Sequence, residues 1–152
     1  MSQALLPLDR WLSAASGGEL ELFPDRGWHP PESWGRWGEG ATHRILLPNR
    51  GLSGSNLFLD LRIMQLADKA GRIPRIEVRV NQTLVATISV ARPMQPQEHR
   101  IVIPPGLLPR TGFTAIELMP EGGSILASTI MAGDDRSLGV GLIALRLQEA
   151  TN

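Results

Sequence analysis

Three tryptophans within one short segment are the residues of this chain best suited to contact a ligand. Trp28, Trp34 and Trp37 lie in Gly27–Gly40, together with two consecutive prolines and four glycines. Proline removes a backbone donor and glycine raises the entropic cost of ordering, so the composition predicts an ordered loop rather than a helix or a central strand. Exposed indole rings suit the apolar faces of sugars, whereas buried ones hold a loop onto a core.

Polar side chains that suit sugar hydroxyls accompany these rings in the same loop and in a later one. We expect Trp28 to stack on a sugar ring while the polar groups bind its hydroxyls. The predicted ligand-binding residues are Trp28, His29, Glu32, Arg36, Trp37 and Asp134. The spacing also fits a structural role, in which Trp34 and Trp37 pack over the open end of the fold.

The later loop contains the sequence Asp134-Asp135-Arg136. Adjacent carboxylates can ligate calcium, but that ion takes about 6–8 oxygen ligands and this segment supplies only two side-chain donors. We therefore predict no metal and no cofactor. Arg136 is instead expected to pair with Asp135 or Glu32, which would tie this loop to the tryptophan loop. The two loops would then form one end of the fold and hold the ligand.

The histidines and carboxylates show no pattern that predicts catalysis. His43 and His99 are expected to be strand-face residues, since no two histidines have the spacing of a zinc site. Glu32 and Glu39 are a candidate pair for glycoside hydrolysis, which needs two acids that converge on one bond. A chain with 15 acidic residues always offers such pairs, so we do not predict an enzyme.

The segments that must position these loops alternate polar and apolar residues with a period of two. Ser55–Leu66 shows this most clearly, and Arg75–Val80 repeats it before an expected tight turn at Asn81–Gln82. The expected strands are Glu19–Phe23, Thr42–Leu47, Ser55–Leu66, Arg75–Val80, Thr83–Val90, Glu98–Ile103, Thr114–Met119 and Gly139–Leu147. One dry and one wet face per strand predict two antiparallel sheets, and thus an all-β sandwich of the jelly-roll type.

Two further segments have apolar residues outside this pattern. Ser2–Ser16 carries them at helical spacing and Gly17–Gly18 would end a helix, so a short N-terminal helix is predicted. The expected organisation is a helical arm over residues 1–18 and a jelly-roll domain over residues 19–149. The arm and the apolar run Ile125–Met131 either cover the sandwich or contact another subunit.

Composition narrows the range of partners. The chain has 152 residues, enough for one domain with its own core, and no cysteine for a disulfide or thiolate site. Its 15 basic and 15 acidic residues cancel, which argues against nucleic acid and against an anionic membrane surface. No segment reaches the ~20 apolar residues of a membrane helix, and the N-terminus lacks the pattern of a secretory signal. Localisation therefore stays open between the cytoplasm and a larger protein or particle.

Two motifs resemble a group of small bacterial domains. One is GWHPPESWGRW at Gly27–Trp37, and the other is DDRSLGVGLIALRL at Asp134–Leu147. The central stretch Ile76–Val85 is also similar to these domains, although Gln82 stands where glycine is usual. Such domains accompany glycosyltransferases and surface-polysaccharide proteins. The resemblance implies a jelly-roll sandwich similar to carbohydrate-binding modules, with no catalytic residues to transfer.

The sequence thus leads to two hypotheses of different class. The first is non-catalytic recognition of a bacterial surface polysaccharide or oligosaccharide by the aromatic loop. The second is a structural subunit of an envelope or particle complex, which would bind protein or associate with itself through the N-terminal arm. Burial of the two apolar segments would weaken the second hypothesis, and burial of Trp28 would weaken the aromatic site of the first.

Overall fold

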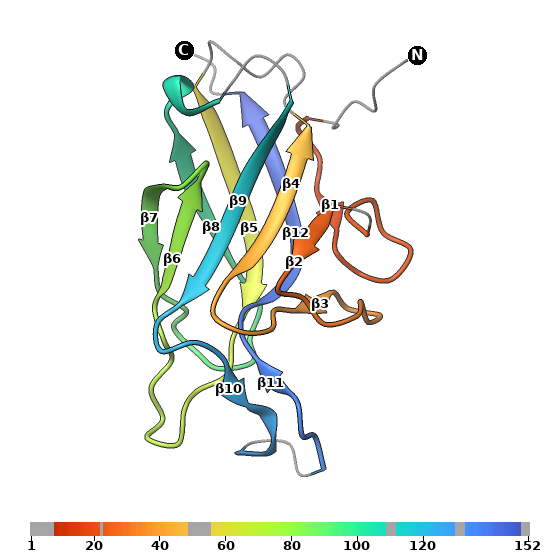
Figure 1. Ribbon diagram of the computed structural model, residues 1–152, viewed down its shortest axis with the longest axis vertical. Helices are drawn as coiled ribbons and strands as arrows, with labels where there is room; N and C mark the ends of the chain where they lie inside the picture. The colour runs from red at the N-terminus through yellow and green to blue at the C-terminus, as the bar shows by residue number, and fades with distance from the viewer. Residues whose placement is uncertain (1–7, 22, 49–55, 109–111, 130–132, 150–152) are drawn as a thin grey trace.

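Two antiparallel sheets pack face to face in this computed structural model (Figure 1). The structure describes residues 8–21, 23–48, 56–108, 112–129 and 133–149. The first sheet joins β1 (Leu12–Ser13), β12 (Gly141–Glu149), β5 (Leu57–Met64) and β8 (Gln97–Ile103), with β3 (Arg36–Trp37) also paired to β12. The second sheet joins β2 (Pro24–Arg26), β4 (His43–Pro48), β9 (Phe113–Pro120), β6 (Ile76–Val80) and β7 (Thr83–Ile88). The predicted all-β antiparallel sandwich is confirmed.

The core forms where the alternating strands of the two sheets face each other. On β5, the inward side chains from Leu57 to Ile63 are fully buried, as are Ile76, Val78 and Val80 on β6. Burial of apolar surface contributes roughly 25 cal/mol per Å², so these strands supply much of the stability of the domain. Their order fixes where the connecting loops leave the sandwich.

The hairpin between β6 and β7 turns at Asn81–Gln82, as the sequence predicts. Both residues adopt positive φ angles, 48° and 73°, which match the twist of a two-residue hairpin turn. The side-chain N–H of Asn81 also donates to the Leu107 carbonyl, and its side-chain oxygen accepts the N–H of Ala115. This side chain therefore compensates for the strain of a left-handed residue other than glycine.

The predicted N-terminal helix is wrong for the part of Ser2–Ser16 that the structure describes. Leu12–Ser13 is strand β1, which pairs with the edge of β12. The N–H groups of Asp9 and Ala14 also donate to β12 carbonyls, at 2.8 and 2.9 Å. An unpaired sheet edge offers backbone partners over the whole segment, and this tertiary pairing prevails over the helical spacing of the leucines. Residues 2–7 of the expected helix lie outside the described residues.

Two other strand predictions need correction. Glu19–Phe23 is not a strand in the residues described, because turns occupy Gly18–Glu21 and the strand β2 begins at Pro24. The expected strand Thr83–Val90 occurs as β7, but Leu84 of its alternating apolar set is exposed. The pairing register between β6 and β7 shifts between Val78 and Arg79. β7 is also the edge strand of its sheet, where the opposite sheet covers fewer side chains.

The long loops carry short elements of their own. A 3₁₀ turn, η1 (Pro105–Leu107), follows β8, and the late loop holds β10 (Ile125–Leu126), η2 (Ala127–Thr129) and β11 (Ser137–Leu138). β10 and β11 pair as a small ribbon at the lower end of Figure 1, where the segment 65–75 also lies. Within the described residues, no helix has the length and apolar character needed to cross a membrane.

Candidate functional site

The tryptophan loop, residues 24–41, is held against the first sheet by backbone hydrogen bonds. β3 pairs with β12, placing Trp37 opposite Gly141. The Gly38 N–H donates to the Val140 carbonyl at 2.7 Å, and the Gly139 N–H donates to the Gly38 carbonyl at 2.8 Å. These bonds join the two sequence motifs, which stand about a hundred residues apart in the chain. The prediction that the motif loops meet is confirmed.

Trp37 belongs to the core rather than to the surface. Its exposed fraction is 2%, and it packs in a cluster with Met64, Leu66 and Leu138. Trp34 is half-buried and meets Trp37 edge to face, with ring centroids 5.0 Å apart. An indole in this position has no free face for a sugar, so Trp37 does not serve as a stacking platform in this conformation. The structural alternative weighed from the sequence holds for this pair.

Trp28 is the ring expected to be most exposed, and the structure places it half inside. Its Nε1–H donates to the carbonyl of Arg44 at 2.8 Å. The ring packs against the main core and lies 5.4 Å from the imidazole of His43, centroid to centroid. Because both its polar atom and its inner face are occupied, Trp28 anchors the loop to β4.

His43 is the residue in this region whose role the sequence conceals. It lies in the strand β4, as expected from the sequence, and its exposed fraction is 0%. The imidazole packs directly against Gly38 and Gly139. A Cβ added at either glycine would stand 2.2 Å from ring atoms. Its Nε2 accepts the N–H of Val140 at 3.0 Å. Burial lowers the pKa of His43 to about 4, so the ring is neutral at pH 7.

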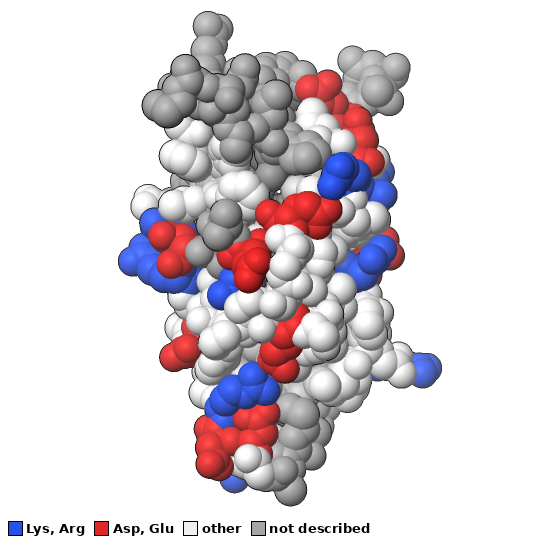
Figure 2. All heavy atoms as spheres, turned by 90° about the vertical axis from the view of Figure 1, so that its right-hand side faces the viewer, with Lys and Arg blue, Asp and Glu red and all other residues white. Residues whose placement is uncertain are grey.

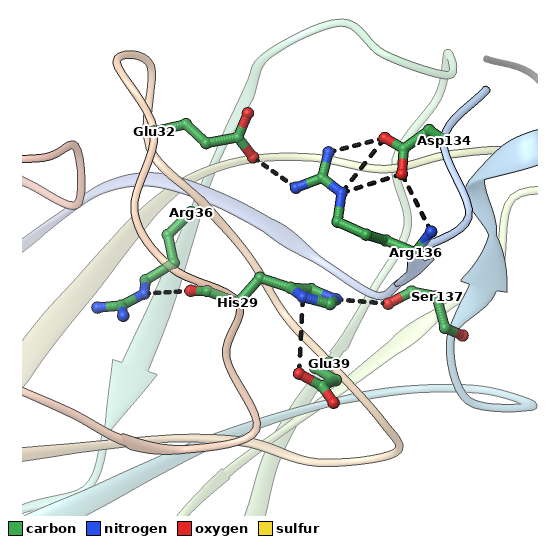
Figure 3. A network of polar contacts seen from close by, with 7 residues as sticks. All are labelled: His29, Glu32, Arg36, Glu39, Asp134, Arg136 and Ser137. Atoms are coloured by element: carbon green, nitrogen blue, oxygen red, sulfur yellow. Dashed lines mark hydrogen bonds and ion pairs between the residues drawn. The ribbon is translucent and has the colours of Figure 1, made fainter. Parts of the chain in front are cut away.

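Arg136 links the late loop to the tryptophan loop through a second set of contacts (Figure 3). Its Nη1 lies 3.0 Å from Glu32 Oε2, and its Nη2 lies 2.8 Å from Asp134 Oδ2. The Arg136–Glu32 pairing is as predicted, whereas the partner in the late loop is Asp134 rather than Asp135. Hydrogen bonds from Arg136 lower the pKa of the Asp134 carboxyl to about 2, so this side chain is ionised at neutral pH.

His29 and Arg36 complete this contact region, which we call the junction (Figure 3). His29 Nε2 lies 2.8 Å from the Ser137 carbonyl and therefore donates to it, while its Nδ1 lies 3.6 Å from Glu39 Oε2. Arg36 Nε donates to the His29 carbonyl at 2.8 Å. Burial lowers the pKa of Arg36. Five of the six predicted site residues thus make contacts inside the protein through polar atoms, and Trp37 does so through packing.

The outer side of the junction is half-exposed and of mixed charge. Figure 2 shows acidic and basic side chains interspersed over this side of the molecule, without a block of one sign. Glu32 and Arg136 each expose about a third of their side chains, 36% and 37%. Within the described ranges, no three histidine or carboxylate side chains lie close enough to hold a metal ion. The junction can therefore offer hydrogen bonds to a polar ligand from partly exposed side chains.

An open cleft lies on another side of the β10–β11 ribbon, and the sequence reasoning missed it. It is formed by residues from the segments 68–75 and 121–126 and encloses about 750 Å³. This volume falls in the range of roughly 300–1,000 Å³ that small-molecule sites occupy. We call it the end cleft. Its apolar wall includes Ile73, Pro74 and Ile125, together with Leu126, which is 51% exposed.

Charged side chains line the rest of the end cleft. Arg75 Nε lies 3.0 Å from Glu121 Oε1, and Arg72 Nε lies 3.7 Å from Asp68 Oδ2. The Asp68 carboxylate also accepts the N–H groups of Ala70 and Arg72 at 2.9 Å, which fixes the turn that carries Lys69. Among the described residues, Lys69 has no hydrogen-bond or ion-pair partner.

A serine pair connects the end cleft with the junction. Ser124, in the cleft wall, lies 2.6 Å from Ser137 between the two hydroxyl oxygens. Ser137 in turn holds His29 through its carbonyl. The signals for the cleft in the sequence were the Gly122–Gly123 turn and the charged Asp68–Arg75 segment, both of which are common in loops. Only their approach in space makes a concave surface from them.

Comparisons with known proteins give relatives in fold only. No protein-family model and no curated protein sequence matches this chain. Among solved structures, it is similar to the CBM36-1 domain of a multidomain xylanase from the hindgut metagenome of Trinervitermes trinervoides, with 14% identity, 94% of this chain and 98% of that chain covered, and a TM-score of 0.54. A family 35 carbohydrate binding module from an environmental isolate matches at 14% identity over 88% of this chain and 80% of that one, with a TM-score of 0.44. The first likeness establishes that this chain has the β-sandwich fold of that carbohydrate-binding module.

Proposed function

We propose that this chain is a non-catalytic carbohydrate-binding domain that recognises a bacterial surface polysaccharide. The observation that carries the proposal is the end cleft of about 750 Å³ on a sandwich similar in fold to a carbohydrate-binding module. The cleft is open to solvent, which suits a chain of sugars that continues beyond the contacted residues. Its charged and aliphatic walls can supply hydrogen bonds and contact area for such residues.

The junction would extend the binding surface rather than form its centre. Glu32, Glu39 and Asp134 keep carboxylate oxygens partly exposed there, and Arg136 orients two of them. Planar groups held by a neighbour lose little entropy when they bind a hydroxyl, which favours weak but specific contacts. Avidity from several copies would then raise the overall affinity.

The experiment is calorimetric titration with a panel of neutral and acidic bacterial capsular polysaccharides and exopolysaccharides. Leu126→Glu places a carboxylate in the aliphatic wall of the cleft and should strongly weaken binding of the polysaccharide that the wild-type chain binds. Val102→Glu is the matched control, because Val102 is 54% exposed against 51% for Leu126 and lies on β8 away from the cleft. Equal binding by both variants would rule out the end cleft, and silence of the wild-type chain over the whole panel would refute the function.

The assembly hypothesis has less support. The described part of the N-terminal arm packs on its own sandwich, since Leu12 is fully buried and Leu8 is half-buried against the core. In the apolar run Ile125–Met131, Ala127 is buried, whereas Leu126 is exposed and lines the cleft. Residues 130 and 131 lie outside the described residues. Sedimentation that shows a stable oligomer without glycan would revive this hypothesis.

A further inference from the structure

The end cleft lacks the side chains by which proteins usually hold neutral sugars. None of the described residues that form its walls is aromatic, and their apolar part is aliphatic. The tryptophans of the chain are used elsewhere, in the core cluster of Trp34 and Trp37, in the anchoring contact of Trp28, and on the outer face of the first sheet for Trp11. Stacking on a sugar ring therefore contributes little here, and another interaction must supply the affinity.

The charges of the cleft supply that interaction. Among the described residues, its walls carry three cations, Lys69, Arg72 and Arg75, against two carboxylates, Asp68 and Glu121. Arg75 and Glu121 neutralise each other at 3.0 Å. Asp68 is 3.7 Å from Arg72 and already accepts two backbone N–H groups, so it balances the remaining pair of cations only in part. An excess of positive charge remains on one side of the cleft.

Lys69 and Arg72 are placed to meet a ligand. Both come from the turn that Asp68 stabilises, in which the Asp68 N–H donates to the Arg72 carbonyl at 2.7 Å. The side chain of Arg72 is 85% exposed, so its outer nitrogens remain accessible to a second carboxylate. A guanidinium binds a carboxylate through two parallel hydrogen bonds, and an ammonium adds a point charge beside it. A turn fixed before binding lowers the entropy lost on binding.

We infer that the end cleft selects acidic polysaccharides, with Lys69 and Arg72 pairing with the carboxylates of uronic-acid residues. The inference rests on the proposed function and adds to it the chemical class of the glycan. The chain as a whole has no net charge. The selection is therefore a property of this cleft rather than of a general attraction between the protein and polyanions.

The test compares ligands that differ only in charge. The probes are polygalacturonate, the same polymer with its carboxylates methyl-esterified, alginate, neutral dextran and dextran sulfate. Polygalacturonate or alginate should bind, and esterification should weaken binding about tenfold or more. Raising the salt from 50 to 500 mM should also weaken binding, because the Debye length falls to a few Å.

Variants locate the effect on the cleft. Lys69→Ala and Arg72→Ala should each weaken binding of the uronate about two- to fivefold, as exposed ion pairs do, and the double variant about tenfold. Lys69→Arg keeps the charge and should retain most of the affinity. Arg26→Ala removes one exposed positive charge from β2, outside the cleft, and should leave binding unchanged.

The single lysine of the chain gives a second readout. Bound polygalacturonate or alginate should protect Lys69 from an amine-reactive reagent, whereas dextran should not. Equal affinity for the esterified and free polymers, or equal loss with Arg26→Ala, would overturn the inference and leave the proposed function standing. Equal binding of dextran sulfate and the uronates would also overturn it, in favour of general polyanion attraction. Failure of every glycan, including the bacterial panel, would overturn the proposed function itself.

Discussion

The tryptophan loop and the end cleft both contact the β10–β11 ribbon, but their side chains differ in type and in exposure. The loop concentrates aromatic rings and glycines, and its rings are turned inward or hydrogen-bonded. The residues described for the cleft include no aromatic ring, and its charged groups lie at the surface. An unusual sequence motif can therefore reflect packing rather than ligand binding. Close contacts around His43 leave room only for glycine at two positions of these loops.

The largest effect is expected in the loop, for Trp37→Ala. Removing a fully packed aromatic side chain leaves a cavity, so the free energy of unfolding should fall by about 3–5 kcal/mol. Denaturant unfolding measures it. Trp11→Ala is the control, because that ring is half-exposed between Arg62 and Arg146 on the outer face and should cost less. Unchanged stability of Trp37→Ala would contradict a packing role and restore the ring as a candidate sugar platform.

The buried imidazole of His43 should make the stability of the loop region depend on pH. The pKa of His43 is about 4 in the folded protein. In the unfolded chain the imidazole takes its ordinary pKa of 6.5. The unfolded chain therefore binds more protons between these values, and stability falls as the pH is lowered from 6.5 to 4. The expected loss is about 3 kcal/mol over this window.

Unfolding by denaturant at a series of pH values measures this loss. His43→Gln keeps an acceptor for the Val140 N–H but removes the titrating group, so its stability should vary less across the same window. A variant that retains the full slope would show that other groups cause it. The lowered pKa values of Asp60 and Asp134 place their own titration at lower pH.

Substitution of Gly38 or Gly139 should have the next largest effect on stability. Gly139→Ala or Gly38→Ala introduces a Cβ 2.2 Å from the imidazole of His43, and such overpacking costs typically about 1–3 kcal/mol. Gly106→Ala is the matched control, because nothing lies within 4 Å of its Cβ position. Thermal unfolding of the three variants separates them. Unchanged stability of Gly139→Ala would mean that the loop can move away from β12. Packing would then not explain the glycines of the tryptophan loop.

The smallest effect on stability is expected in the cleft. Lys69→Ala and Arg72→Ala change exposed side chains, so unfolding free energies should stay within about 0.5 kcal/mol of wild type. Binding of a uronate should nevertheless weaken. A variant that loses binding without losing stability distinguishes a ligand surface from a packing element. Trp28→Ala should show the reverse, with lower stability and nearly unchanged affinity for the folded fraction.

The sheets could be predicted because their strands alternate strictly. Ser55–Leu66 and Arg75–Val80 carry the period-two pattern of strands with one buried face, and β5 and β6 occur there. Prediction failed where a partner far away in sequence decided the conformation. Leu12 has a helical neighbourhood in sequence, but the free edge of β12 made it a strand. No local pattern contains information about that edge.

The candidate site was predicted only in part, for a related reason. The meeting of the two motif loops and the contact between Glu32 and Arg136 follow from residue types that pair wherever topology brings them together. The direction of each ring does not follow, because an indole is equally suited to a core and to a sugar. The end cleft was missed because Lys69 and Glu121 are unremarkable side chains until their turns approach each other.

The sequence by itself determined the fold class, the turn at Asn81–Gln82 and the two motif loops, since periodicity, turn chemistry and glycine spacing act over a few neighbouring residues. Only the tertiary structure decided which surfaces remain open. Burial depends on what lies opposite a side chain, and that is set by strands distant in the chain. For this reason the tryptophans became structural, His43 became a buried neutral base, and a set of ordinary charged residues became the best candidate for a binding site.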